Sequence, residues 1–110
     1  MTPNPEPSAR YPLAIVGAGA LGLSFAARLA EVGPVAVIAR SAARAAELRA
    51  GVEVGGVRFR PDAFGPDALP GADWVIVLVK AGDTAEAART ALAMGPGGVL
   101  SLQNGLTEDV

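Results

Sequence analysis

The sequence predicts an α/β fold: a Rossmann-like, doubly wound and mostly parallel sheet, with a small β-hairpin after the second helix. An apolar run at 13–16 leads directly into a Gly-x-Gly-x-x-Gly motif at 17–22, and a helical pattern follows at once. Apolar runs at 35–39 and 73–79 lack polar alternation, which is typical of parallel strands covered on both faces. Helical segments separate these runs, as expected when each parallel strand is followed by a crossover helix.

The three glycines of the motif each have a physical role at the end of the first strand. Gly17 permits a tight turn, Gly19 lets a pyrophosphate approach the backbone, and Gly22 lets the next helix pack closely on the strand. The start of that helix offers its unpaired N–H groups to phosphate. We therefore predict dinucleotide binding here. The alternative is a tight strand-to-helix turn that binds nothing.

The first helix is expected at 20–32, because Gly33 and Pro34 then end the helical pattern. Apolar residues recur along it at helical spacing and predict the stripe that faces the core. This stripe consists of Leu21, Phe25, Leu29 and Val32.

The remaining elements follow from the same signals. Ser41 is expected to cap the second helix, and residues 61–71, with three prolines and two glycines, are expected to form a connecting loop. With right-handed crossovers, and with the hairpin supplying the third strand, the sheet order is 3-2-1-4-5. The other elements are expected as strands 35–39, 73–79 and 99–102, helices 42–50 and 83–94, and a hairpin pairing 52–54 with 57–59.

Composition excludes several classes of protein. The 110 residues fit a single domain, and a net charge of −2 without a basic block argues against a nucleic-acid or membrane-surface binder. Cys and His are both absent, so we expect no disulfide, no Cys/His metal site and no Ser-His arrangement. Residues 1–11 are expected to be a disordered Pro-rich tail and not a signal peptide. No apolar run reaches the length of a membrane span, and we expect a soluble, cytoplasmic protein.

Polar residues follow the ends of the predicted strands. In a parallel sheet all carboxyl ends meet at one edge, where ligands bind at the point at which the strand order reverses. The residues at these ends are Gly17, Gly19, Arg40, Lys80, Gln103 and Asn104.

Arg40 stands where NAD-binding enzymes usually carry an acidic residue for the ribose 2′-hydroxyl. A guanidinium instead makes a charge-assisted contact with a 2′-phosphate, worth about 1.5–3 kcal/mol, and Ser41 can add its hydroxyl. The sequence therefore favours NADP(H) over NAD(H). The alternative is a solvated arginine. Arg44 can share the phosphate or simply face water, and we expect it to face water.

Lys80 is the single lysine beside eight arginines. At the sheet edge its ammonium can hold a ribose hydroxyl, a substrate carboxylate or an ordered water, or it can simply extend into solvent. Gln103 and Asn104 can orient cofactor or substrate beside the expected nicotinamide position, although Asn-Gly is also a common turn.

These motifs together resemble the N-terminal domain of the ketopantoate reductase (2-dehydropantoate 2-reductase) family, over nearly all of 13–110. The resemblance rests on the segments 15–22, Arg40, 77–84 and 102–106. It implies NADPH-dependent reduction of ketopantoate to pantoate, on the route to pantothenate and coenzyme A. It places Lys80 and Asn104 near the nicotinamide and the substrate, and implies a set of further cofactor-binding residues. The implied cofactor-binding set is Gly17, Ala18, Gly19, Ala20, Leu21, Gly22, Arg40, Ser41, Lys80, Gln103 and Asn104.

Family members continue into a helical second domain that supplies a catalytic lysine as general acid. Residues 107–110 resemble a helix start, so we expect the chain to be a piece of such a protein and to be inactive alone. Two alternatives remain: a stand-alone NADP(H) sensor without catalysis, and a related reductase of another 2-oxo acid. Self-association through exposed apolar surface is a further expectation.

Overall fold

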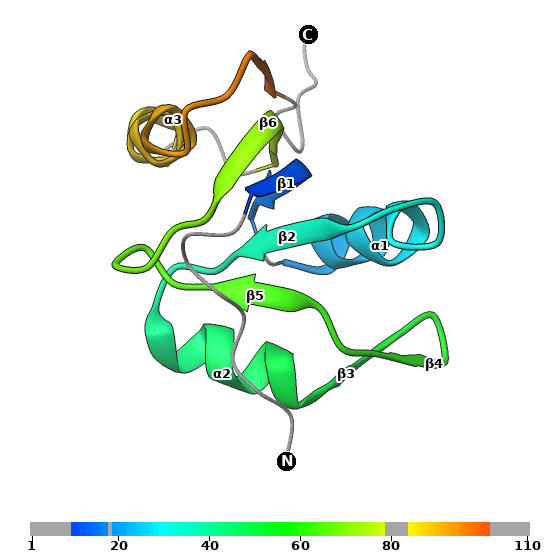
Figure 1. Cartoon of the computed structure of the whole chain (residues 1–110). Coiled ribbons are helices and arrows are strands. Elements are labelled where there is room, and N and C mark those ends of the chain that lie inside the picture. Colours follow the sequence, from blue (N-terminus) through cyan, green and yellow to red (C-terminus); the bar gives the residue numbers. More distant parts are fainter. Residues whose placement is uncertain (1–9, 18, 79–83, 102–110) are drawn as a thin grey trace, which may run out of the picture.

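The chain forms a five-stranded parallel sheet with helices on both faces, which confirms the predicted fold class. The structure, a computed structural model, describes residues 10–17, 19–78 and 84–101 (Figure 1). The sheet order is β5-β2-β1-β6-β7, and all four pairings are parallel. Strands β3 and β4 form the separate antiparallel hairpin predicted around the Gly-Gly turn. The elements in chain order are β1 (Arg10–Val16), α1 (Ala20–Leu29), β2 (Val35–Ile38), α2 (Ala42–Ala50), β3 (Val52–Val54), β4 (Val57–Phe59), β5 (Asp62–Phe64), β6 (Gly71–Val77), α3 (Thr84–Ala93) and β7 (Gly98–Ser101).

Two apolar clusters, one on each face of the sheet, hold the layers together. Helices α1 and α2 bury Leu23 and Leu48 against one face, around Ile15 of β1. Helix α3 buries Ala87 and Ala91 against the other face (Figure 1). Within the described part of the chain, no helix is long and apolar enough to cross a membrane.

The third strand of the sheet is β5, which lies inside the stretch predicted to be a loop. The hairpin, which was expected to supply this strand, stands apart from the sheet, so that expectation was wrong. Ala63 and Phe64 are buried where β5 pairs with β2. Pro61 precedes this short edge strand, a position where the missing N–H of proline costs no ladder hydrogen bond. Three residues are too few to show a strand pattern amid prolines and glycines.

Strand β1 begins at Arg10, three residues earlier than predicted and within the stretch expected to be a tail. The Arg10 guanidinium pairs with Asp73 at 2.7 Å and donates to the carbonyl oxygens of Ala72 and Gly95. Tyr11 is buried, and its hydroxyl donates to Asp62 at 2.9 Å. Burial and the neighbouring carboxylate raise the pKa of Tyr11 to about 12.

Helix α1 presents to the core a face that differs in part from the one predicted. Its buried residues are Gly22, Leu23 and Ala26. Of the predicted stripe, Leu29 packs against the core, whereas Leu21 and Phe25 are exposed. The small side chains at 22 and 26 let the helix approach the sheet closely, and that docking turns the bulkier residues outward. The helix also ends at Leu29, so that Val32 lies in the following turn and is 86% exposed.

Candidate functional site

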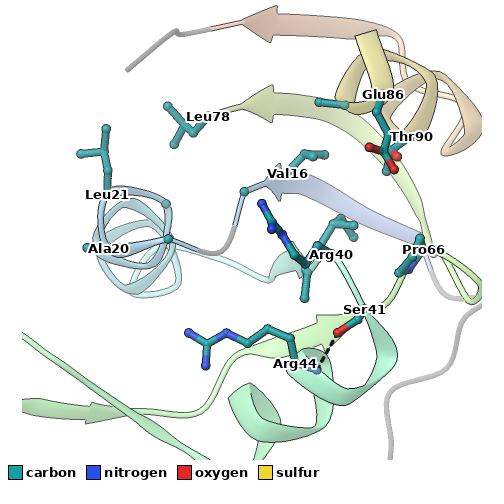
Figure 2. A pocket seen from close by; sticks show the side chains of 16 residues that line it. Val16, Ala20, Leu21, Arg40, Ser41, Arg44, Pro66, Leu78, Glu86 and Thr90 are labelled. Carbon is teal, nitrogen blue, oxygen red and sulfur yellow. Dashed lines mark hydrogen bonds between the residues drawn. The ribbon is translucent and has the colours of Figure 1, made fainter. Parts of the chain in front are cut away.

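A cavity of about 950 Å³ opens at the carboxyl ends of β1 and β2. This cavity, called the edge pocket below, lies at the reversal point of the strand order, because β1 has β2 on one side and β6 on the other. Its size is that of a site for a drug-sized or cofactor-sized ligand. The lining residues are Val16, Gly17, Gly19, Ala20, Leu21, Gly22, Ile38, Ala39, Arg40, Ser41, Arg44, Pro66, Leu78, Glu86, Ala87 and Thr90 (Figure 2).

The glycine turn forms one wall of the edge pocket. Gly17 has a φ of 122°, a conformation that strongly favours glycine, and its N–H donates to the carbonyl of Ile38 on the neighbouring strand. A methyl group on Gly22 would collide with the carbonyl oxygen of Gly17, so helix and turn are in the closest possible contact. A methyl group on Gly19 would meet nothing within 4 Å. The turn is thus tight on its helix side and open on its pocket side, as a backbone that receives a ligand must be.

The start of α1 is suited to an anion. Gly19 is the N-cap and provides no side-chain acceptor, so the first N–H groups of the helix keep their capacity to donate to a ligand. No acidic residue occurs in the first turn to repel a phosphate. The positive end of the helix dipole and these donors together fit a pyrophosphate.

The second wall carries the positive charge. Arg40 lies two residues beyond the end of β2, and the intervening Ala39 is fixed by donating its N–H to the carbonyl of Phe64 at 2.8 Å. Ser41 is the N-cap of α2, as predicted, and its Oγ accepts the N–H of Arg44 at 3.1 Å. Arg44 was expected to face water. It does keep 42% side-chain exposure, yet it lines the edge pocket beside Arg40 and Ser41 (Figure 2).

Helix α3 supplies the third wall, which the sequence did not reveal. Glu86 and Thr90 lie one turn apart on the same helix face and line the edge pocket, and Pro66 adds an apolar side from the turn after β5 (Figure 2). The capping spacing around Glu86 predicted only a helix start. The available signal was the i, i+4 spacing of two polar residues at the carboxyl edge of the sheet.

The structure brings together many of the residues predicted to bind the cofactor. Residues 17, 19–22, 40 and 41 all line the edge pocket, although they come from two separate segments of the chain. The predicted site residues Ala18, Lys80, Gln103 and Asn104 lie outside the described residues.

Comparison with known proteins agrees with this geometry. No curated protein matches the chain. The family described as ketopantoate reductase PanE/ApbA matches residues 13–109, from within β1 to beyond β7, and the match is to its N-terminal domain. That span contains every segment that lines the edge pocket. The chain therefore belongs to the ketopantoate reductase PanE/ApbA family and carries the family's nucleotide-binding oxidoreductase domain.

Proposed function

We propose that the chain binds NADP(H) in the edge pocket and serves the NADPH-dependent reduction of ketopantoate to pantoate. The observation that carries the proposal is the position of Arg40 and Ser41. Both follow β2 and line the same cavity as the glycine turn. A dinucleotide whose pyrophosphate lies on the turn would bring its adenosine ribose to this end of β2.

The chemistry of this wall favours a phosphorylated ribose. The three residues after β2 are Ala39, Arg40 and Ser41, and none of them can accept the hydrogen bond of a ribose 2′-hydroxyl as a carboxylate does. A guanidinium matches the oxygens of a 2′-phosphate with two parallel hydrogen bonds. The pyrophosphate would take the N–H groups at the start of α1, next to Gly19.

The reacting end of the cofactor would lie towards the ends of β6 and β7. We propose that Lys80 and Asn104 orient the nicotinamide and the 2-oxo acid there, with Gln103 beside them. When bound, NADPH supplies the hydride for the carbonyl carbon of the substrate. The carbonyl oxygen also needs a proton donor, which the resemblance assigns to a lysine of the family's second domain.

The test of the cofactor assignment is titration calorimetry with NADPH and NADH. The unchanged protein should bind NADPH at least about tenfold more tightly, since one charge-assisted contact of 1.4 kcal/mol or more is at stake. Arg40→Ala should remove most of this difference, whereas Arg28→Gln, at the far end of α1, should keep it. Equal affinities in the unchanged protein would refute the assignment.

The test of the reaction is the loss of reduced-nicotinamide absorbance on adding ketopantoate to the chain supplied with the family's helical second domain. Turnover with ketopantoate supports the proposal, and turnover with another 2-oxo acid in its place would correct the substrate. Tight NADPH binding without turnover of any 2-oxo acid would instead indicate a sensor.

A further inference from the structure

We propose that Arg44 is a second cation of the 2′-phosphate site and that, with Arg40 and Ser41, it sets the preference for NADPH over NADH. The inference rests on the NADP(H) function proposed above. All three residues lie between the end of β2 and the first turn of α2, and all three line the edge pocket.

The cap of α2 fixes the backbone position of Arg44. Ser41 caps α2 by accepting the N–H of Arg44, so the backbone of Arg44 is held one turn into the helix. Figure 2 shows the side chains of Arg40 and Arg44 extending from the same end of the edge pocket, with Ser41 beside them. Both arginine side chains therefore border the edge pocket and start from neighbouring positions beside Ser41.

The charge of the ligand calls for more than one cation. A phosphate ester carries nearly two negative charges at neutral pH and has three acceptor oxygens. One guanidinium neutralises one charge and reaches two oxygens, so a second guanidinium matches what remains. The Ser41 hydroxyl accepts from the Arg44 backbone and still has its own hydrogen to donate. The first turn of α2 carries no acidic residue.

The ion pair between Arg44 and Glu47 does not prevent this role. Its atoms, Nη1 and Oε1, lie 3.1 Å apart, and the two side chains are 42% and 67% exposed. Exposed pairs of this kind change an equilibrium by less than about fivefold. A hydrogen bond to a charged phosphate changes it by tenfold or more. The phosphate therefore competes successfully with Glu47 for Arg44.

The experiment is titration calorimetry of the unchanged protein, Arg44→Gln and the matched control Arg28→Gln with NADPH and with NADH. Arg28 lies in the last turn of α1, does not line the edge pocket, and loses the same charge on substitution. We expect Arg44→Gln to weaken NADPH binding about tenfold and NADH binding less than twofold. The control should change neither by more than twofold. Adenosine 2′,5′-bisphosphate and AMP should repeat the contrast, because they differ only in the 2′-phosphate.

The outcomes of these titrations separate the role of Arg44 from the proposed NADP(H) function. An unchanged NADPH affinity in Arg44→Gln, with selectivity still lost in Arg40→Ala, overturns the role of Arg44 and leaves the proposed function intact. Equal losses for NADPH and NADH, or an altered circular-dichroism melt, would show that Arg44 supports the fold. Arg44→Met then decides, because it keeps an aliphatic side chain without the charge: an intact fold with reduced selectivity supports the proposal, and full selectivity overturns it. A parent protein that does not prefer NADPH overturns both proposals.

Discussion

Substitutions at Gly19 and Gly22 should separate ligand binding from folding, although the two glycines belong to one turn. An added Cβ at Gly22 lies 3.0 Å from the carbonyl carbon of Gly17, about 0.5–1 Å inside normal carbon contact, and nearer still to the oxygen. Both atoms belong to the backbone, so no side chain can move away. At Gly19 the same Cβ meets nothing within 4 Å, and the φ of −77° is open to any residue.

The expected magnitudes follow from these contacts. Overpacking costs about 1–3 kcal/mol, and alanine regains up to about 1 kcal/mol in helix propensity, so Gly22→Ala should destabilise by roughly 1–2 kcal/mol. This lowers the melting temperature by about 5–15 °C in a domain of this size. Gly19→Val should change the free energy of unfolding by no more than about 1 kcal/mol, since a bulky N-cap is only slightly unfavourable. Its side chain would displace one or two charged hydrogen bonds, or roughly 2–4 kcal/mol of binding.

The assay combines melting by far-UV circular dichroism with titration by NADPH and NADH. Gly19→Val should melt close to the unchanged protein and lose roughly 30- to 1,000-fold in affinity for both cofactors, because the pyrophosphate is common to both. Gly19→Ala should lose less. Normal affinity in Gly19→Val would show that the turn does not receive the pyrophosphate. A normal melt for Gly22→Ala would show that the helix does not dock as closely as described.

Three further predictions concern charge and chemistry. Arg40→Asp should invert the cofactor preference, so that calorimetry shows NADH binding more tightly than NADPH, because the new carboxylate repels the phosphate and accepts a 2′-hydroxyl. The free energy of unfolding should fall as the pH rises from 10 towards 12. The raised pKa of Tyr11 keeps its phenol neutral in the folded chain, whereas the same phenol ionises in the unfolded chain. Tyr11→Phe should lessen this fall, as measured by melting curves at alkaline pH. With the family's helical second domain supplied, fused or in trans, Lys80→Ala and Asn104→Ala should lower ketopantoate turnover. The 110 residues by themselves should bind NADPH without turnover. Unaltered rates in the first case, or activity in the second, would contradict the proposed roles.

Local chemistry made much of this fold predictable from sequence. The tight turn at Gly17, the Ser41 cap and the Gly-Gly hairpin turn each depend on residues within a few positions of one another, and each was predicted correctly. The buried strands β2 and β6 were also predicted, with ends shifted by one or two residues, because parallel strands covered on both faces are continuous apolar runs.

Features that depend on distant contacts were not predictable in the same way. Strand β5 is three residues long and exists because its backbone pairs with β2 and the side chain of Phe64 is buried against Tyr11. The orientation of α1 depends on how near the helix comes to the turn at Gly22, a tertiary contact that outweighs the larger apolar area of Leu21 and Phe25. The periodicity of a helix shows that it has an apolar face, but small residues can decide which face docks.

The difference between local and tertiary determinants also explains which walls of the edge pocket could be predicted from the sequence. Residues at the carboxyl end of a strand have a position fixed by topology, so Gly19 and Arg40 could be placed together from the order of elements alone. Residues on the flanking helices reach the cavity only through the rotation of those helices, which packing decides. Arg44 and Glu86 therefore required the structure, and they stand on opposite walls of the cavity with opposite charges. We therefore expect the first wall to attract a phosphate and the second to repel it, so that a dinucleotide would bind with its 2′-phosphate towards α2.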